Sequence, residues 1–145
     1  MILNEWQYGI TKTQMQKFQL AISQLRNKPL PEDKNEQICH LAYIDSLKSQ
    51  MEEFTQEIEE YENLKDNQGK IEKLQYDSLE KLPEALIKAR IIRGYTQESF
   101  AQLLGVKPQQ VQRDEANGYA SASLTKLLKI QHILNLEIRE EIIFK

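Results

Sequence analysis

Lys107, Gln109, Gln110 and Arg113 bring several hydrogen-bond donors to one short stretch of the chain. Glutamine can form two hydrogen bonds with the major-groove edge of adenine, and arginine can do the same with guanine. No acidic residue lies in the first turn after Pro108, which suits a helix whose N-terminus points at phosphate groups. Because the two glutamines and the arginine fall on one helix face, they predict base contacts with double-stranded DNA.

The residues around this helix predict the turn that would position it. Thr96 can cap a helix that runs to Leu104, and Gly105 can adopt the left-handed conformation that ends such a helix. Pro108 is tolerated at the first position of the following helix, which we expect to end at Ala116. Short helices joined by turns of three or four residues are typical of a helix-turn-helix bundle.

Residues 79–135 resemble the Xre/Cro/lambda-repressor family of helix-turn-helix domains. The matching positions are residues 94–97, Ala101, Gly105-Val106, Arg113 and Glu115, and the helix-forming run from Ser123 to Ile130. Two positions depart from the family pattern. Tyr95 replaces an aliphatic residue, and Asp114 stands where an apolar or aromatic residue is common.

The resemblance implies roles for individual residues. It implies base reading by Gln109, Gln110 and Arg113. It implies phosphate contact by Gln97, which would also have a positioning role, by Lys107, and by the backbone around Asn117 to Tyr119.

Two longer amphipathic helices are predicted before this region. The first runs from Thr11 to about Asn27, with an apolar stripe of Met15, Phe18, Ile22 and Leu25. The second runs from about Glu32 to Asp66, with a heptad seam of Ile44, Leu47, Met51, Phe54, Ile58 and Tyr61. We expect the two helices to form an antiparallel hairpin. Because the second helix is too long for the first to cover alone, we expect its exposed seam to meet a second copy of the chain or another protein.

In the last ten residues, the spacing of the apolar side chains changes from that of a helix to near alternation. Leu136, Ile138, Ile142 and Phe144 alternate with charged residues, which favours a strand. We expect it to pair with its own symmetry mate or with residues 2–8. The predicted fold is therefore mainly α, with an N-terminal helical hairpin over 1–66, a linker over 67–78, the helix-turn-helix domain over 79–135 and a short C-terminal β-strand over 136–145.

The formal net charge of −3 hides a segregation of charge along the chain. Residues 1–70 hold 8 Lys and Arg against 12 Asp and Glu, whereas residues 82–135 hold 7 against 4. The predicted DNA-binding segment is thus basic, although the chain as a whole is acidic. The acidic segment would stay off DNA and suits a basic protein partner.

Several classes of site are not indicated by the sequence. Cys39 is the single cysteine, so no internal disulfide is expected, and Cys39-His40 lacks the further ligands of a metal site. The chain shows no nucleophile paired with a base and no phosphate loop, so we expect neither an enzyme nor a cofactor. With no signal peptide and no apolar run of membrane-spanning length, we expect a cytoplasmic protein with no membrane partner.

These patterns predict a repressor that binds a pseudo-palindromic operator as a homodimer. Two hypotheses remain for residues 1–66. The overall arrangement resembles bacterial antitoxin-type regulators, which implies a type II antitoxin that neutralises a toxin and represses its own operon. The alternative is a free-standing phage-like or metabolic repressor whose hairpin only dimerises. A lesser third hypothesis is a structural adaptor that binds no DNA.

Overall fold

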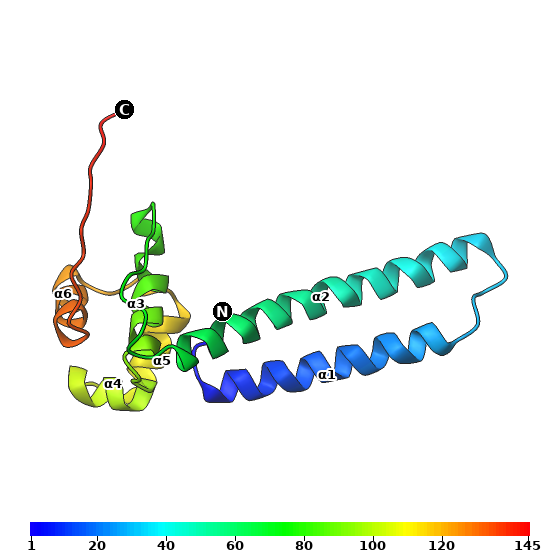
Figure 1. Cartoon of the computed structure of the whole chain (residues 1–145), viewed down its shortest axis with the longest axis horizontal. Coiled ribbons are helices and arrows are strands. Elements are labelled where there is room, and N and C mark those ends of the chain that lie inside the picture. Colours follow the sequence, from blue (N-terminus) through cyan, green and yellow to red (C-terminus); the bar gives the residue numbers. More distant parts are fainter. The chain divides into compact units, whose positions relative to one another are not determined.

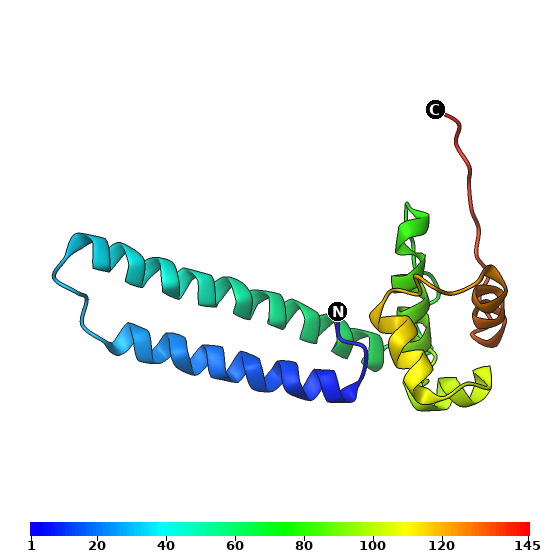
Figure 2. The ribbon, with the colours of Figure 1, turned by 180° about the vertical axis from the view of Figure 1, so that it is seen from behind.

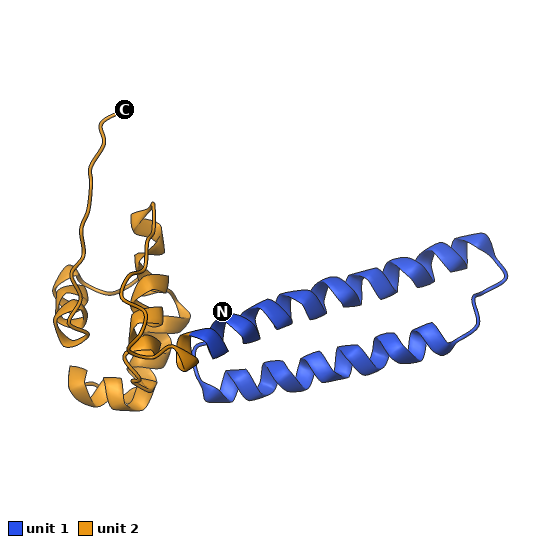
Figure 3. Ribbon diagram, in the orientation of Figure 1, with its two compact units in different colours: residues 1–63 blue, residues 64–145 orange.

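The computed structural model describes residues 1–145, in which all regular secondary structure is helical. The chain divides into two compact units, residues 1–63 and residues 64–145 (Figure 3). None of the helices combines the length and the apolar character that crossing a membrane requires.

The first unit is a helical hairpin. Helix α1 (Glu5–Asn27) and helix α2 (Lys34–Asp66) lie side by side and run in opposite directions (Figure 1 and Figure 2). Helix α1 begins before the predicted Thr11, because the Asn4 side chain accepts a hydrogen bond from the Gln7 amide at 2.9 Å. Asparagine is as effective an N-cap as threonine, so the earlier cap starts the helix.

Helix α1 covers the heptad seam of α2. Ile44, Leu47, Ile58 and Tyr61 are each 6% exposed. Ile22 of α1 joins the first two of these in one buried cluster, and the Phe18 ring lies 5.5 Å from the Phe54 ring.

The prediction that the seam stays exposed is therefore wrong. Because α1 starts at Glu5, its first turns also reach the end of the seam, where the Tyr8 and Tyr61 ring centroids are 5.4 Å apart.

The second unit contains a bundle of short helices (Figure 1). These are the 3-10 helix η1 (Leu79–Lys81), α3 (Leu82–Ile92), α4 (Gln97–Leu104), α5 (Pro108–Ala116) and α6 (Leu124–Ile133). Helix α4 packs against both α5 and α6. The largest side chains with almost no exposure are Phe100, Val111, Ile130 and Leu134. A core of this kind fixes the helices of the bundle against one another.

The predicted start and end of α4 and the predicted start of α5 are confirmed. The Thr96 hydroxyl accepts a hydrogen bond from the Ser99 amide at 3.0 Å, as an N-cap does. Gly105 follows α4 in the left-handed conformation, with φ of 71° and ψ of 31°. Pro108 is the first residue of α5. Local chemistry therefore sets the turn between the two helices.

The predicted C-terminal strand is absent. Residues 136–145 form no regular secondary structure, and Ile142 and Phe144 are 81% and 93% exposed. The expected partner within the chain, residues 2–8, is also unavailable because most of it lies in α1. Alternating apolar residues do not make a strand when no neighbouring strand satisfies the backbone N–H and C=O groups.

Replacing Gly105 with alanine is expected to destabilise the second unit by roughly 1–2 kcal/mol, because alanine is strained at positive φ. A Cβ atom at Gly105 would meet nothing within 4 Å, so the cost arises in the backbone. Urea unfolding followed by circular dichroism measures the change.

Gly9→Ala is the matched control, because a Cβ atom there also meets nothing within 4 Å and Gly9 lies inside α1. Alanine is expected to stabilise that helix by roughly 0.5–1 kcal/mol. An unchanged or higher free energy of unfolding in Gly105→Ala would contradict the assigned role of the Gly105 backbone.

Candidate nucleic-acid interface

Helix α5 presents a polar face to solvent. Gln109 and Arg113 are exposed and lie one helical turn apart, and Lys107, the residue that caps the helix, is exposed as well. Gln110 is half-buried at the edge of this face. The structure thus places two of the three predicted base readers, Gln109 and Arg113, on the exposed side of α5 and the third, Gln110, at the edge of that side. The predicted phosphate contact Lys107 lies at the N-terminal end of the same helix.

The opposite face of α5 is buried and carries two acids. Val111 is 1% exposed, and Asp114 and Glu115 are each 3% exposed. A buried carboxylate is costly unless it is paired and hydrogen-bonded. Both acids meet this requirement, through separate sets of partners.

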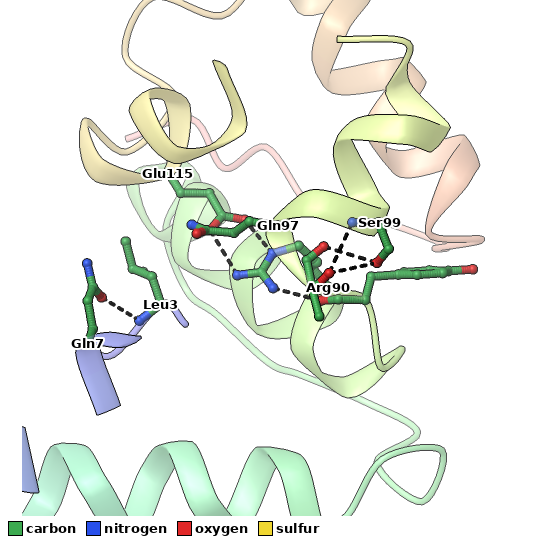
Figure 4. Close-up of polar contacts among 8 residues, drawn as sticks. Leu3, Gln7, Arg90, Gln97, Ser99 and Glu115 are labelled. Carbon is green, nitrogen blue, oxygen red and sulfur yellow. Dashed lines mark hydrogen bonds and ion pairs between the residues drawn. The ribbon is translucent and has the colours of Figure 1, made fainter. Parts of the chain in front are cut away.

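Glu115 forms a buried, bidentate ion pair with Arg90 of α3 (Figure 4). The Arg90 Nε and Nη2 atoms donate to the two carboxylate oxygens at 2.5 and 2.9 Å. Gln97 of α4 donates from Nε2 to Glu115 Oε2 at 2.7 Å, and Arg90 Nη1 donates to the Tyr95 carbonyl oxygen at 2.7 Å. This cluster ties α3, α4 and the turn before α4 to the end of α5.

Gln97 lies inside this cluster. The residue is 6% exposed, and its side-chain nitrogen donates to Glu115. Contact of Gln97 with phosphate stays a prediction, whereas a positioning role fits the observed hydrogen bond.

Sequence reasoning missed the role of Arg90. The signal that would have found it is a charged residue in the middle of the apolar stretch of α3, where Leu86, Ile87, Ala89, Ile91 and Ile92 are all buried. A charge at such a position needs a buried partner of opposite sign, and Glu115 is that partner.

Asp114 has its own partners. Lys126 of α6 forms an ion pair with Asp114 Oδ2, and Gln110 donates from Nε2 to Asp114 Oδ1 at 2.9 Å. The departure from the apolar pattern at this position is therefore accommodated by a lysine on the neighbouring helix.

The turn after α5 places its residues differently. The Asn117 amide donates to the Arg113 carbonyl oxygen at 3.0 Å and closes the helix, and the Asn117 side chain is exposed. Tyr119 is 6% exposed and has a positive φ of 56°. Burial, together with the charge of Glu115, raises the pKa of the Tyr119 hydroxyl. The Tyr119 side chain thus belongs to the core, and phosphate contact by the backbone of this turn stays a prediction.

Residues 86–140 match the family model described as Helix-turn-helix. Neither a curated protein nor a solved structure matches the chain. The described residues contain no group of three or more His, Cys, Asp or Glu side chains placed to hold a metal ion.

Arg90→Met and Glu115→Leu are each expected to destabilise the second unit by roughly 3–5 kcal/mol, because each leaves one buried charge without its partner. The double variant is expected to cost clearly less than the sum, because it removes both charges together. Urea unfolding of the four proteins measures the coupling.

The exposed pair formed by Glu137 and Arg139 is the control, since its side chains are 74% and 86% exposed. Glu137→Ala is expected to change stability by less than about 0.5 kcal/mol. Additive effects of the Arg90 and Glu115 substitutions would show that the pair does not hold α5 in place.

Proposed function

We propose, because residues 86–140 match a helix-turn-helix family of the Xre/lambda-repressor-like type, that the protein is a sequence-specific DNA-binding transcriptional repressor. The observation that carries the proposal is the division of α5 into two faces. Gln109 and Arg113 face solvent, whereas Glu115 on the other face is hydrogen-bonded to side chains of α3 and α4. Side chains that read bases need a rigid support of this kind.

The exposed residue types suit the two parts of DNA recognition. Arg113 can bind the O6 and N7 atoms of guanine, and Gln109 can bind adenine. Lys107, at the N-terminus of α5, can bind phosphate, where the backbone N–H groups and the helix dipole also favour an anion. The net positive charge of residues 82–135 supports the same role.

A homodimer is the second part of the proposal. Helix α5 has 9 residues, which reach only a few base pairs. Two copies about 34 Å apart, one DNA turn, would read both halves of a pseudo-palindromic operator and multiply the specificity.

The hairpin carries the finer part of the proposal, that the protein is the antitoxin of a type II pair. The outward side of α2 carries acidic and amide side chains that line a groove, namely Glu53, Gln56, Glu57, Glu59, Glu60 and Asn63. This charge favours a basic protein partner, and the helix-turn-helix match lies outside these residues, in the other unit of the chain.

The alternative is a free-standing repressor whose hairpin only dimerises. Large apolar side chains on the hairpin are more than half exposed and would suit a second copy; they are Trp6, Leu20, Ile38, Leu41 and Tyr43.

Arg113→Ala is expected to weaken binding to the operator by roughly 1–3 kcal/mol and to relax the preference at one base pair. Lys107→Ala is expected to weaken binding to all sequences alike and to lower the salt dependence by about one released counterion. Titrations of the operator and of random DNA over a range of salt concentrations measure both effects.

Arg139→Ala is the matched control, because it removes one positive charge from the same unit at a residue outside α5. It is expected to leave sequence preference unchanged. If Arg113→Ala discriminates between operator and random DNA as strongly as the wild-type protein does, base reading by Arg113 is ruled out.

The two proposed roles of the hairpin predict that substitutions on different surfaces impair function. If the protein is an antitoxin, Glu53→Lys/Glu59→Lys abolishes rescue of cells from the toxin of the adjacent gene and leaves operator binding intact, because only the acidic groove changes. If the hairpin only dimerises, Ile38→Glu/Leu41→Glu converts the dimer to a monomer. Growth assays and sedimentation measure these outcomes. Full rescue by the charge-reversed variant would exclude toxin binding through the acidic groove.

A further inference from the structure

A second polar cluster connects the core of the bundle to the exposed face of α5. Asp114 is 3% exposed and forms an ion pair with Lys126 of α6, whose side chain is 24% exposed. Asp114 also accepts a hydrogen bond of 2.9 Å from Nε2 of the half-buried Gln110. We propose that Asp114 and Lys126 are positioning residues that fix the side-chain amide of Gln110 for reading one base pair. This inference rests on the proposed function in DNA binding.

The chemistry of the carboxylate decides which end of the amide faces the core. An ionised carboxylate accepts hydrogen bonds and donates none, so the Gln110 nitrogen, and not its oxygen, must face Asp114. A glutamine without such a partner can rotate its amide and exchange donor with acceptor. Fixing the nitrogen leaves Oε1 and the second N–H hydrogen in a defined arrangement toward the exposed face of α5.

Lys126 occupies the other oxygen of the Asp114 carboxylate. Its ammonium group donates to Oδ2, while the Gln110 nitrogen donates to Oδ1. The ion pair at Oδ2 holds the carboxylate in one orientation and so fixes the position of Oδ1. Lys126 thus acts on Gln110 through Asp114, from a different helix.

Stability alone does not account for this cluster. An apolar residue at position 114 would fill the buried site without the desolvation of a charge, and such replacements are often neutral or stabilising. The cluster also differs from that of Glu115, which accepts hydrogen bonds from Arg90 and from the buried Gln97. Among the two buried acids of α5, Asp114 is the one that contacts a residue at the edge of the exposed face.

The test uses the full-length protein and a DNA duplex that the wild-type protein selects from a randomised library. Dissociation constants are measured at one salt concentration for this duplex and for all of its single-base-pair variants. Gln110→Ala is expected to reduce discrimination at one base pair by about 5-fold or more. Asp114→Leu/Lys126→Met is expected to reduce it at the same base pair, and the triple variant is expected to lose no more than Gln110→Ala.

Lys126→Arg is the conservative control, because it retains a positive charge for Asp114, and it is expected to keep most of the discrimination. Discrimination at the base pair read by Arg113 is expected to be unchanged in all of these variants. Circular dichroism and the unfolding midpoint establish that each variant is folded.

A second measurement needs no variant. In the wild-type protein, the side-chain amide protons of Gln110 are expected to exchange with water more slowly than those of the exposed Gln109, which provides the internal comparison. Equal exchange rates would overturn the inference.

The outcomes separate this inference from the proposed function. If the wild-type protein selects a sequence and Asp114→Leu/Lys126→Met keeps full discrimination, the inference is wrong and the proposed function stands. If the wild-type protein selects no sequence, both are wrong.

Discussion

The ion pair between Arg90 and Glu115 is the interaction on which the candidate interface depends. Both side chains are almost fully removed from solvent, so each charge requires the other. Their two parallel hydrogen bonds define the distance and the angle between α3 and the end of α5, and Gln97 adds α4 to the same arrangement. The exposed face of α5 takes its orientation from this contact, because the residues that face solvent are on the other side of the same short helix.

The parts of the fold that could be predicted from sequence are those that local chemistry determines. The cap at Thr96, the left-handed Gly105 and the first-turn Pro108 each act within a few residues, so the turn between α4 and α5 was predictable. The exposed positions of Gln109 and Arg113 follow from the same helix limits. Helical periodicity likewise predicted both long helices, although the effective cap of α1 is Asn4 rather than Thr11.

The parts that could not be predicted depend on contacts between distant residues. Gln97 and Asp114 are polar residues whose burial becomes clear only when Arg90, Glu115 and Lys126 are placed around them. The seam of α2 is covered by α1, which a comparison of helix lengths did not indicate. Residues 136–145 have the alternation of a strand and no strand beside them, so periodicity alone gave the wrong structure.

We propose that the exposed face of α5 reads DNA while the buried face holds the helix in place. An NMR titration of the isotope-labelled full-length protein with its selected duplex tests this claim most directly. The predicted result is that the largest chemical-shift changes fall on Lys107, Gln109, Gln110 and Arg113, with small changes at the buried Arg90. Changes confined to residues 1–63, or no changes at saturating duplex, would contradict the account.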